Sequence, residues 1–125
     1  MTKTTDVVDR YMAVWSEPDA DARHAAVASL WAVDGTEFLE GKQIHGHDEL
    51  TARVARAYEA FVASGKYAIT FADDVAWHDD IVTFTAQLTA PSGEIDWSAR
   101  VFLVLDSDNR IQEDYHLTVK PLPPS

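Results

Sequence analysis

Cysteine is absent from the 125-residue sequence. Its absence excludes a disulfide framework, a thiolate nucleophile and a zinc–thiolate site, and it fits a reducing compartment. No stretch approaches the roughly 20 consecutive apolar residues that a membrane-spanning helix needs, and the first residues lack the apolar core of a signal peptide. We therefore expect a soluble, cytoplasmic protein that does not bind membranes.

Basic side chains are scarce. Ten Lys and Arg residues stand against 21 Asp and Glu, which gives a formal net charge of −11. Such a surface repels a phosphate backbone, and no run of Lys or Arg offsets the repulsion locally. The five glycines are scattered and form neither a dinucleotide-binding nor a P-loop pattern. We expect no nucleic-acid binding and no cofactor.

The length predicts a single domain over residues 1–125, with a core at about 5–119 and a proline-rich tail at 120–125. Glu49 and Arg53 are spaced to pair at i, i+4 on a helix. Apolar residues at helical spacing predict three helices: one from Thr4 or Thr5 to about Trp15, one from about Asp21 to Trp31, and one from His47 or Asp48 to a C-cap at Gly65.

Residues 34–46 predict a turn and a short strand pair before the third helix. From residue 66 onward the apolar period changes to two, and short turns separate the segments. This pattern predicts an antiparallel meander of four strands, at about 66–77, 81–90, 95–106 and 110–119. The fold class is therefore α+β.

The last predicted strand has two contrasting faces. Its odd positions from 111 to 119 are mostly apolar, and its even positions from 112 to 118 are all polar. Asp114 and His116 lie about 7 Å apart on the polar face, which suits two groups that address one small ligand. The same face could simply meet water. His116 is the strongest catalytic candidate, because its reference pKa of about 6.5 allows proton exchange near neutrality.

Other candidates have alternative interpretations. Tyr11 shares a helical face with apolar residues and could belong to the core or to a site. His45 and His47 flank Gly46, but two histidines without further spaced ligands are weak evidence, and we expect no metal. The large aromatic residues should divide between the core and a concave apolar pocket: Trp15, Trp31, Phe38, Tyr58, Phe61 and Trp97.

Four short patterns resemble those of the nuclear transport factor 2-like (NTF2-like) superfamily: Arg10-Tyr11-x-x-x-Trp15, Leu30-Trp31-Ala32-x-Asp34, Ile44-x-Gly46 and Leu105-Asp106-x-x-x-Arg110-Ile111. The resemblance covers about residues 5–119. It implies a cone-shaped, cystatin-like α+β fold with a curved antiparallel sheet around the third helix. It also implies that Asp114, His116 and Thr118 face the cavity. The convex face, which carries apolar residues, should then be covered by a second copy of the chain in a homodimer.

Within this superfamily the ketosteroid isomerases supply one template. Tyr11 is similar to the tyrosine that donates a hydrogen bond to the developing enolate oxygen, and Trp31 and Phe84 are similar to pocket-lining aromatic residues. Leu39 stands at the position of the aspartate base, and Val101 stands at that of the aspartate oxyanion donor. Two acidic residues lie near the base position but out of register: Glu37 and Glu40.

The SnoaL-like polyketide cyclases supply a second template, because His116 stands where they have an acid/base aspartate on the last strand. Asp114 and Arg100 resemble part of the site of limonene-epoxide-hydrolase-like proteins, but the period of two turns Arg100 to the other face. The resemblance implies an isomerase, cyclase or dehydratase for a small carbonyl-containing hydrophobic substrate.

In this interpretation His116, Asp114 and Tyr11 carry the acid/base chemistry. The alternative is a non-catalytic ligand-binding or dimeric assembly module. The expected substrate contacts are Trp15, Trp31, Phe38, Tyr58, Phe84, Trp97 and Thr118.

Overall fold

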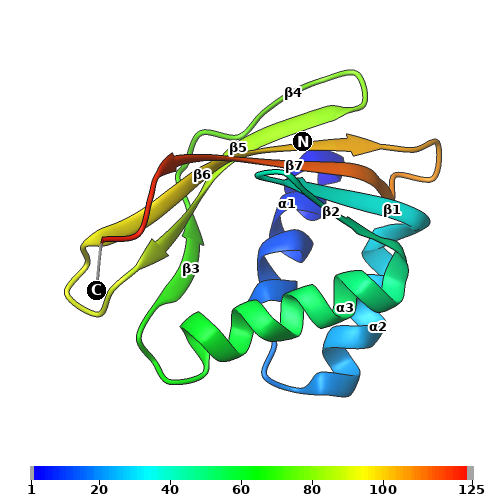
Figure 1. Cartoon of the computed structure of the whole chain (residues 1–125). Helices are drawn as coiled ribbons and strands as arrows, with labels where there is room; N and C mark the ends of the chain where they lie inside the picture. Colours follow the sequence, from blue (N-terminus) through cyan, green and yellow to red (C-terminus); the bar gives the residue numbers. More distant parts are fainter. Residues whose placement is uncertain (1, 124–125) are drawn as a thin grey trace.

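The computed structural model describes residues 2–123, and side chains from Asp6 onward. The first helix begins ahead of its predicted caps, Thr4 and Thr5. None of the described helices is long and apolar enough to cross a membrane. The elements, labelled in Figure 1, are α1 (Thr2–Trp15), α2 (Ala20–Leu30), β1 (Trp31–Leu39), β2 (Lys42–His45), α3 (Gly46–Ala57), the π-helical turn η1 (Tyr58–Val62), β3 (Ala68–Phe71), β4 (Ala76–His78), β5 (Ile81–Thr89), β6 (Ile95–Leu105) and β7 (Ile111–Lys120).

The first two helices form the predicted hairpin. Asp19 caps α2, because its side chain accepts a hydrogen bond from the backbone nitrogen of Ala22 at 2.8 Å. The helix ends at Leu30, and Trp31 has extended backbone angles (φ −92°, ψ 147°) and begins β1. The prediction that Trp31 belongs to the helix is therefore wrong by one residue.

The third helix begins at Gly46, where a φ of +84° reverses the chain without steric cost. Glu49 accepts a hydrogen bond from the backbone nitrogen of His45 at 2.9 Å. The predicted pairing of Glu49 with Arg53 is wrong, because Arg53 pairs with a strand residue instead. The helix continues through η1.

The predicted meander is present in the antiparallel pairs β5–β6 and β6–β7. The strand predicted over 66–77 is two short strands, β3 and β4, which both pair with β5. Asp74 lies between them and accepts hydrogen bonds from the backbone nitrogen and the hydroxyl of Thr85, at 3.0 and 2.7 Å. These bonds hold the bend that interrupts the strand.

The first strand gives the sheet a parallel pair that the sequence analysis did not predict. β1 pairs antiparallel with β2 and parallel with β7, so the seven described strands form a mixed sheet in the order β2-β1-β7-β6-β5-β3, with β4 against β5. Gly35 lies where β1 approaches β7, and a Cβ atom there would stand 2.8 Å from the carbonyl oxygen of Ile111. The parallel register places Glu37 opposite Asp114.

The sheet curves over the helices, which pack against one of its faces (Figure 1). Asp114 and His116 lie on this inner face of β7 and are buried, whereas Leu117 and Val119 are 57% and 67% exposed. A register shift between β6 and β7 lets Ile111 point inward as well. The alternative in which the polar face of β7 meets water is therefore wrong.

Candidate functional site

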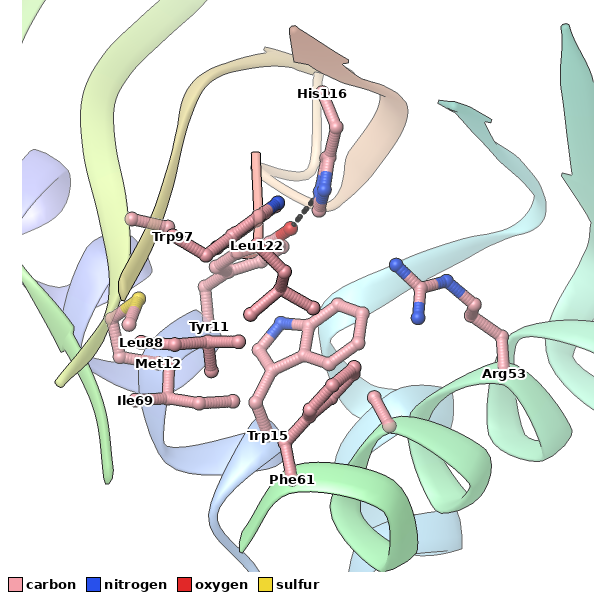
Figure 2. Close-up of a pocket in the computed structure, with 12 residues that line it drawn as sticks. Tyr11, Met12, Trp15, Arg53, Phe61, Ile69, Leu88, Trp97, His116 and Leu122 are labelled. Carbon is pink, nitrogen blue, oxygen red and sulfur yellow. Dashed lines mark hydrogen bonds between the residues drawn. The ribbon is translucent and has the colours of Figure 1, made fainter. Parts of the chain in front are cut away.

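A cavity of about 150 Å³ opens between the helices and the inner face of the sheet (Figure 2). Nine of its twelve lining residues are apolar, and the polar three are Tyr11, Arg53 and His116. Leu122, from the irregular tail after β7, forms part of the wall. The apolar lining residues are Met12, Trp15, Ala57, Phe61, Ile69, Ala86, Leu88, Trp97 and Leu122.

The three predicted catalytic residues lie together in the structure. The hydroxyl oxygen of Tyr11, on α1, is 2.8 Å from Asp114 Oδ2 and 2.6 Å from His116 Nε2. His116 Nε2 is also 3.0 Å from Asp114 Oδ1. All three side chains are buried, with exposed fractions of 1%, 0% and 6% for Tyr11, Asp114 and His116.

These distances favour one arrangement of protons. The carboxylate of Asp114 can only accept, so the Tyr11 hydroxyl donates its proton to Oδ2. The short contact between Tyr11 and His116 then requires that Nε2 carries a proton and donates it to the hydroxyl oxygen. The result is a directed relay from His116 through Tyr11 to Asp114.

Glu37 and Arg53 complete the charged cluster, and the sequence analysis assigned neither to the site. Glu37, on β1, is fully buried, and its Oε2 atom lies 3.2 Å from His116 Nε2. Arg53, on α3, donates from Nε to Glu37 Oε1 at 3.1 Å. The formal charges of the two carboxylates, the guanidinium and a protonated imidazole sum to zero. A neutral His116 would leave one buried negative charge without compensation.

The electrostatic environment favours this protonated state. Burial lowers the pKa of His116. The adjacent Asp114 carboxylate, its hydrogen bond and Glu37 raise this pKa by more than burial lowers it, so the net pKa lies above the ordinary value of 6.5. Burial, with help from Asp114 and Glu37, raises the pKa of Tyr11 well above 10. Burial also raises the pKa of Glu37, against the opposing effects of His116 and Arg53.

The cluster contains donor types that suit a divalent metal ion. Glu37, Asp114 and His116 each offer one atom, and these atoms lie within 4.8 Å of one another. In the proton-based arrangement a protonated His116 and Arg53 together balance the charges of the two carboxylates, so a divalent cation would add positive charge to a cluster that is already neutral. We therefore interpret the cluster as a proton network. His45 and His47 contact a threonine hydroxyl and a backbone carbonyl.

Two predicted aromatic contacts, Trp15 and Trp97, line the cavity. Trp31 and Phe84 are fully buried and do not line it, because their rings pack behind Tyr11 at centroid distances of 5.6 and 5.7 Å. They support the tyrosine from the core and are not part of the wall.

Three other predicted contacts lie outside the cavity wall. Phe38 follows Glu37 on β1 and so points to the opposite face, where its ring stacks on Tyr115 at 4.8 Å. Tyr58, the first residue of η1, lies 4.9 Å from the guanidinium of Arg23 on α2. Thr118 is half-buried near the end of β7 and is not among the lining residues.

The sequence did carry a signal for the two missed residues. Glu37 lies two positions before Leu39, the residue that matches the isomerase base, so the period of a strand puts both on one face. The interpretation that Glu37 is out of register with the base position is therefore wrong, because Glu37 lies in the buried cluster. Arg53 follows Leu50 and precedes Ala57 at helical spacing, which places it on the buried face of α3.

No protein-family model and no curated protein matches the chain. Solved structures do match. A candidate isomerase of the SnoaL-like family from Agrobacterium tumefaciens superposes with a TM-score of 0.84 at 22% identity, over 94% of this chain and 98% of that one. A candidate polyketide cyclase from Sinorhizobium meliloti gives 0.65 at 18% identity, over 89% and 93%.

A further match has a ketosteroid isomerase-like fold, comes from Catenulispora acidiphila and was solved in complex with trimethylamine. Its TM-score is 0.68 at 20% identity, over 90% of this chain and 85% of that one. At such identities the likeness carries information about architecture and not about chemistry. The chain has the fold of the NTF2-like superfamily.

Proposed function

We propose that this protein is an isomerase, cyclase or dehydratase that works by acid/base chemistry on a small carbonyl-containing hydrophobic substrate. The observation that carries the proposal is the position of the His116 imidazole in the wall of a mostly apolar cavity, 2.6 Å from the hydroxyl of Tyr11. Tyr11 and Asp114 hold the ring by direct contacts, as an acid/base residue requires.

The cavity limits the size of the substrate. A closed cavity of about 150 Å³ lined by apolar side chains accommodates a molecule such as benzene, and the present cavity has the same volume. One six-membered ring therefore fits inside, and a larger substrate must extend through the opening. A four-ring steroid nucleus would leave most of its surface outside.

The proposed chemistry moves a proton without consuming one. The neutral form of His116 accepts the α-proton of the substrate as the C–H bond breaks, and it later returns a proton to a carbon of the enolate. The hydrogen bonds from His116 through Tyr11 to Asp114 stabilise the imidazolium that forms between the two steps. Burial strengthens each of these electrostatic interactions, because little water competes for them.

A direct test uses exchange of the α-hydrogens of cyclohexanone for deuterium, followed by NMR in deuterated buffer. The wild-type protein should accelerate exchange above the buffer rate, and His116→Gln should lower this acceleration by roughly 10²–10⁴-fold. The matched control is His45→Gln, because His45 is exposed and lies outside the cavity wall. Equal exchange by His116→Gln and wild type would refute the proposal.

The second candidate is a non-catalytic module that binds a small apolar ligand. The near-complete burial of Tyr11 and Asp114 favours it, because a satisfied buried network can serve the fold alone. Binding of cyclohexanone without accelerated exchange would support this candidate.

We also propose a homodimer that forms through the outer face of the sheet. In the described part of the chain no helix covers this face (Figure 1), and Leu117 and Val119 are mostly exposed on it. Phe102, Val104 and Tyr115 add half-buried apolar area beside them. Exposed apolar area of this kind is typical of an interface.

A further inference from the structure

Arg53 is held on two sides. Its Nε and Nη2 atoms donate to the two carboxylate oxygens of Glu37, at 3.1 and 3.4 Å. Its guanidinium carbon lies 5.0 Å from the centre of the Trp15 ring. Both contacts fix the plane of the guanidinium, so its remaining N–H groups point in defined directions.

These remaining donors are free to meet a ligand. A guanidinium has five N–H donors, and the two bonds to Glu37 use Nε and one hydrogen of Nη2. Among the described residues, Nη1 makes no hydrogen bond. The Arg53 side chain is 20% exposed, whereas Glu37 is fully buried, and Arg53 lines the cavity. Figure 2 shows it reaching from α3 towards Trp15 and the space beneath His116.

We propose that Arg53 binds the substrate oxygen and makes the cavity selective for small cyclic compounds whose carbonyl oxygen becomes, or already is, an enolate. This inference rests on the proposed function and adds its substrate class. The rest of the wall is apolar apart from His116 and Tyr11, so a carbonyl oxygen near Arg53 leaves the ring against Trp15 and Phe61.

The role follows from charge. In the resting cluster two carboxylates balance Arg53 and a protonated His116, so a neutral ketone enters a site of zero net charge. When the neutral form of His116 takes an α-proton from the bound ketone, the C–H bond breaks and His116 becomes positively charged. The negative charge that develops on the substrate oxygen then lies beside a guanidinium that cannot lose its proton. Burial is the main cause of the raised pKa of Tyr11. The positive charge of Arg53 opposes that rise, so the field of Arg53 extends to Tyr11.

The test compares two probes of one ring size by NMR titration of the tryptophan indole signals. Cyclohexane-1,3-dione is an enolate at neutral pH, and cyclohexanone is neutral. Wild type should bind the enolate at least about tenfold more tightly than the ketone, because a hydrogen bond from a charged donor contributes that much. Arg53→Met should abolish this preference, and Arg53→Lys should retain part of it.

A second pair of variants separates ligand binding from folding. Arg53→Met leaves the buried Glu37 carboxylate without its partner and can destabilise the fold, so Glu37→Gln/Arg53→Met removes both charges together. Glu37→Gln alone frees Arg53 and should keep or increase the enolate preference, and the double variant should lose it. An unchanged preference in the folded double variant overturns the role of Arg53.

The two proposals fail in different ways. If wild type binds both probes equally, the inference on Arg53 is wrong, and the proton-exchange assay with His116→Gln still decides the proposed function. If wild type binds neither probe, the ligand class is wrong and both proposals fall.

Discussion

Replacement of Tyr11 by phenylalanine removes one oxygen atom and leaves two buried groups without their partner. The hydroxyl joins Asp114 Oδ2 at 2.8 Å and His116 Nε2 at 2.6 Å, and no solvent reaches either group easily. The ring itself should stay in place, because Trp15, Trp31 and Phe84 pack around it. The variant therefore tests the polar contacts with little change in packing.

The loss of stability can be estimated from these two contacts. A hydrogen bond to a charged group contributes about 1.5–3 kcal/mol to stability, and a stranded buried partner adds to the loss. His116 and Asp114 still face each other at 3.0 Å, which retains part of their attraction. We expect the free energy of unfolding to fall by about 3 kcal/mol, which corresponds to a drop in Tm of roughly 10 °C for a domain of this size.

Urea denaturation followed by tryptophan fluorescence measures this change. Tyr115→Phe is the matched control, because its hydroxyl bonds Glu113 at 2.9 Å on the half-buried outer face, and it should change stability by about 0.5 kcal/mol or less. If Tyr11→Phe differs from wild type by no more than this control does, the relay is not a stabilising network and the directed arrangement of protons is wrong.

Two further predictions concern pH and assembly. The folded pKa of His116 is raised above 6.5, so its contribution to stability is fully present below pH 6.5 and is lost as the pH rises through the folded value; the free energy of unfolding should fall over that range, and His116→Gln should flatten the profile. Sedimentation should show a dimer for wild type and a monomer for Leu117→Glu, because a charge at this exposed apolar position opposes burial; a monomeric wild type at micromolar concentration would contradict the dimer proposal.

Local pattern was enough to predict most elements of the fold. The helices and the strands β5, β6 and β7 follow from periods of 3.6 and two, since each period reports which side of an element is buried. The parallel pairing of β1 with β7 joins residues far apart in the chain, such as Glu37 and Asp114. A period records burial and not the identity of the neighbour, so this pair could not be predicted.

The same limit explains the missed half of the site. Glu49 is four residues from Arg53 and looked like its partner, but an exposed helical pair contributes only a few tenths of a kcal/mol. A buried carboxylate without a cation is far more costly, so Arg53 pairs with Glu37, sixteen residues away. Competition between partners was decided by burial, which depends on the tertiary structure.

The orientation of β7 links the proposed acid/base site to the proposed homodimer. The strand turns Asp114 and His116 inward and Leu117 and Val119 outward, the reverse of what burial of apolar area alone would favour. On the inner face Tyr11 and Glu37 contact these polar groups, and Arg53 in turn pairs with Glu37. These contacts compensate for the burial of charge. On the outer face no described element covers the exposed apolar side chains of Leu117 and Val119. This exposed apolar area is the physical reason to expect a second copy there. A Leu117→Glu monomer with an intact cavity would then show whether the site needs the dimer, because its proton-exchange rate should equal that of wild type if the inner network folds independently.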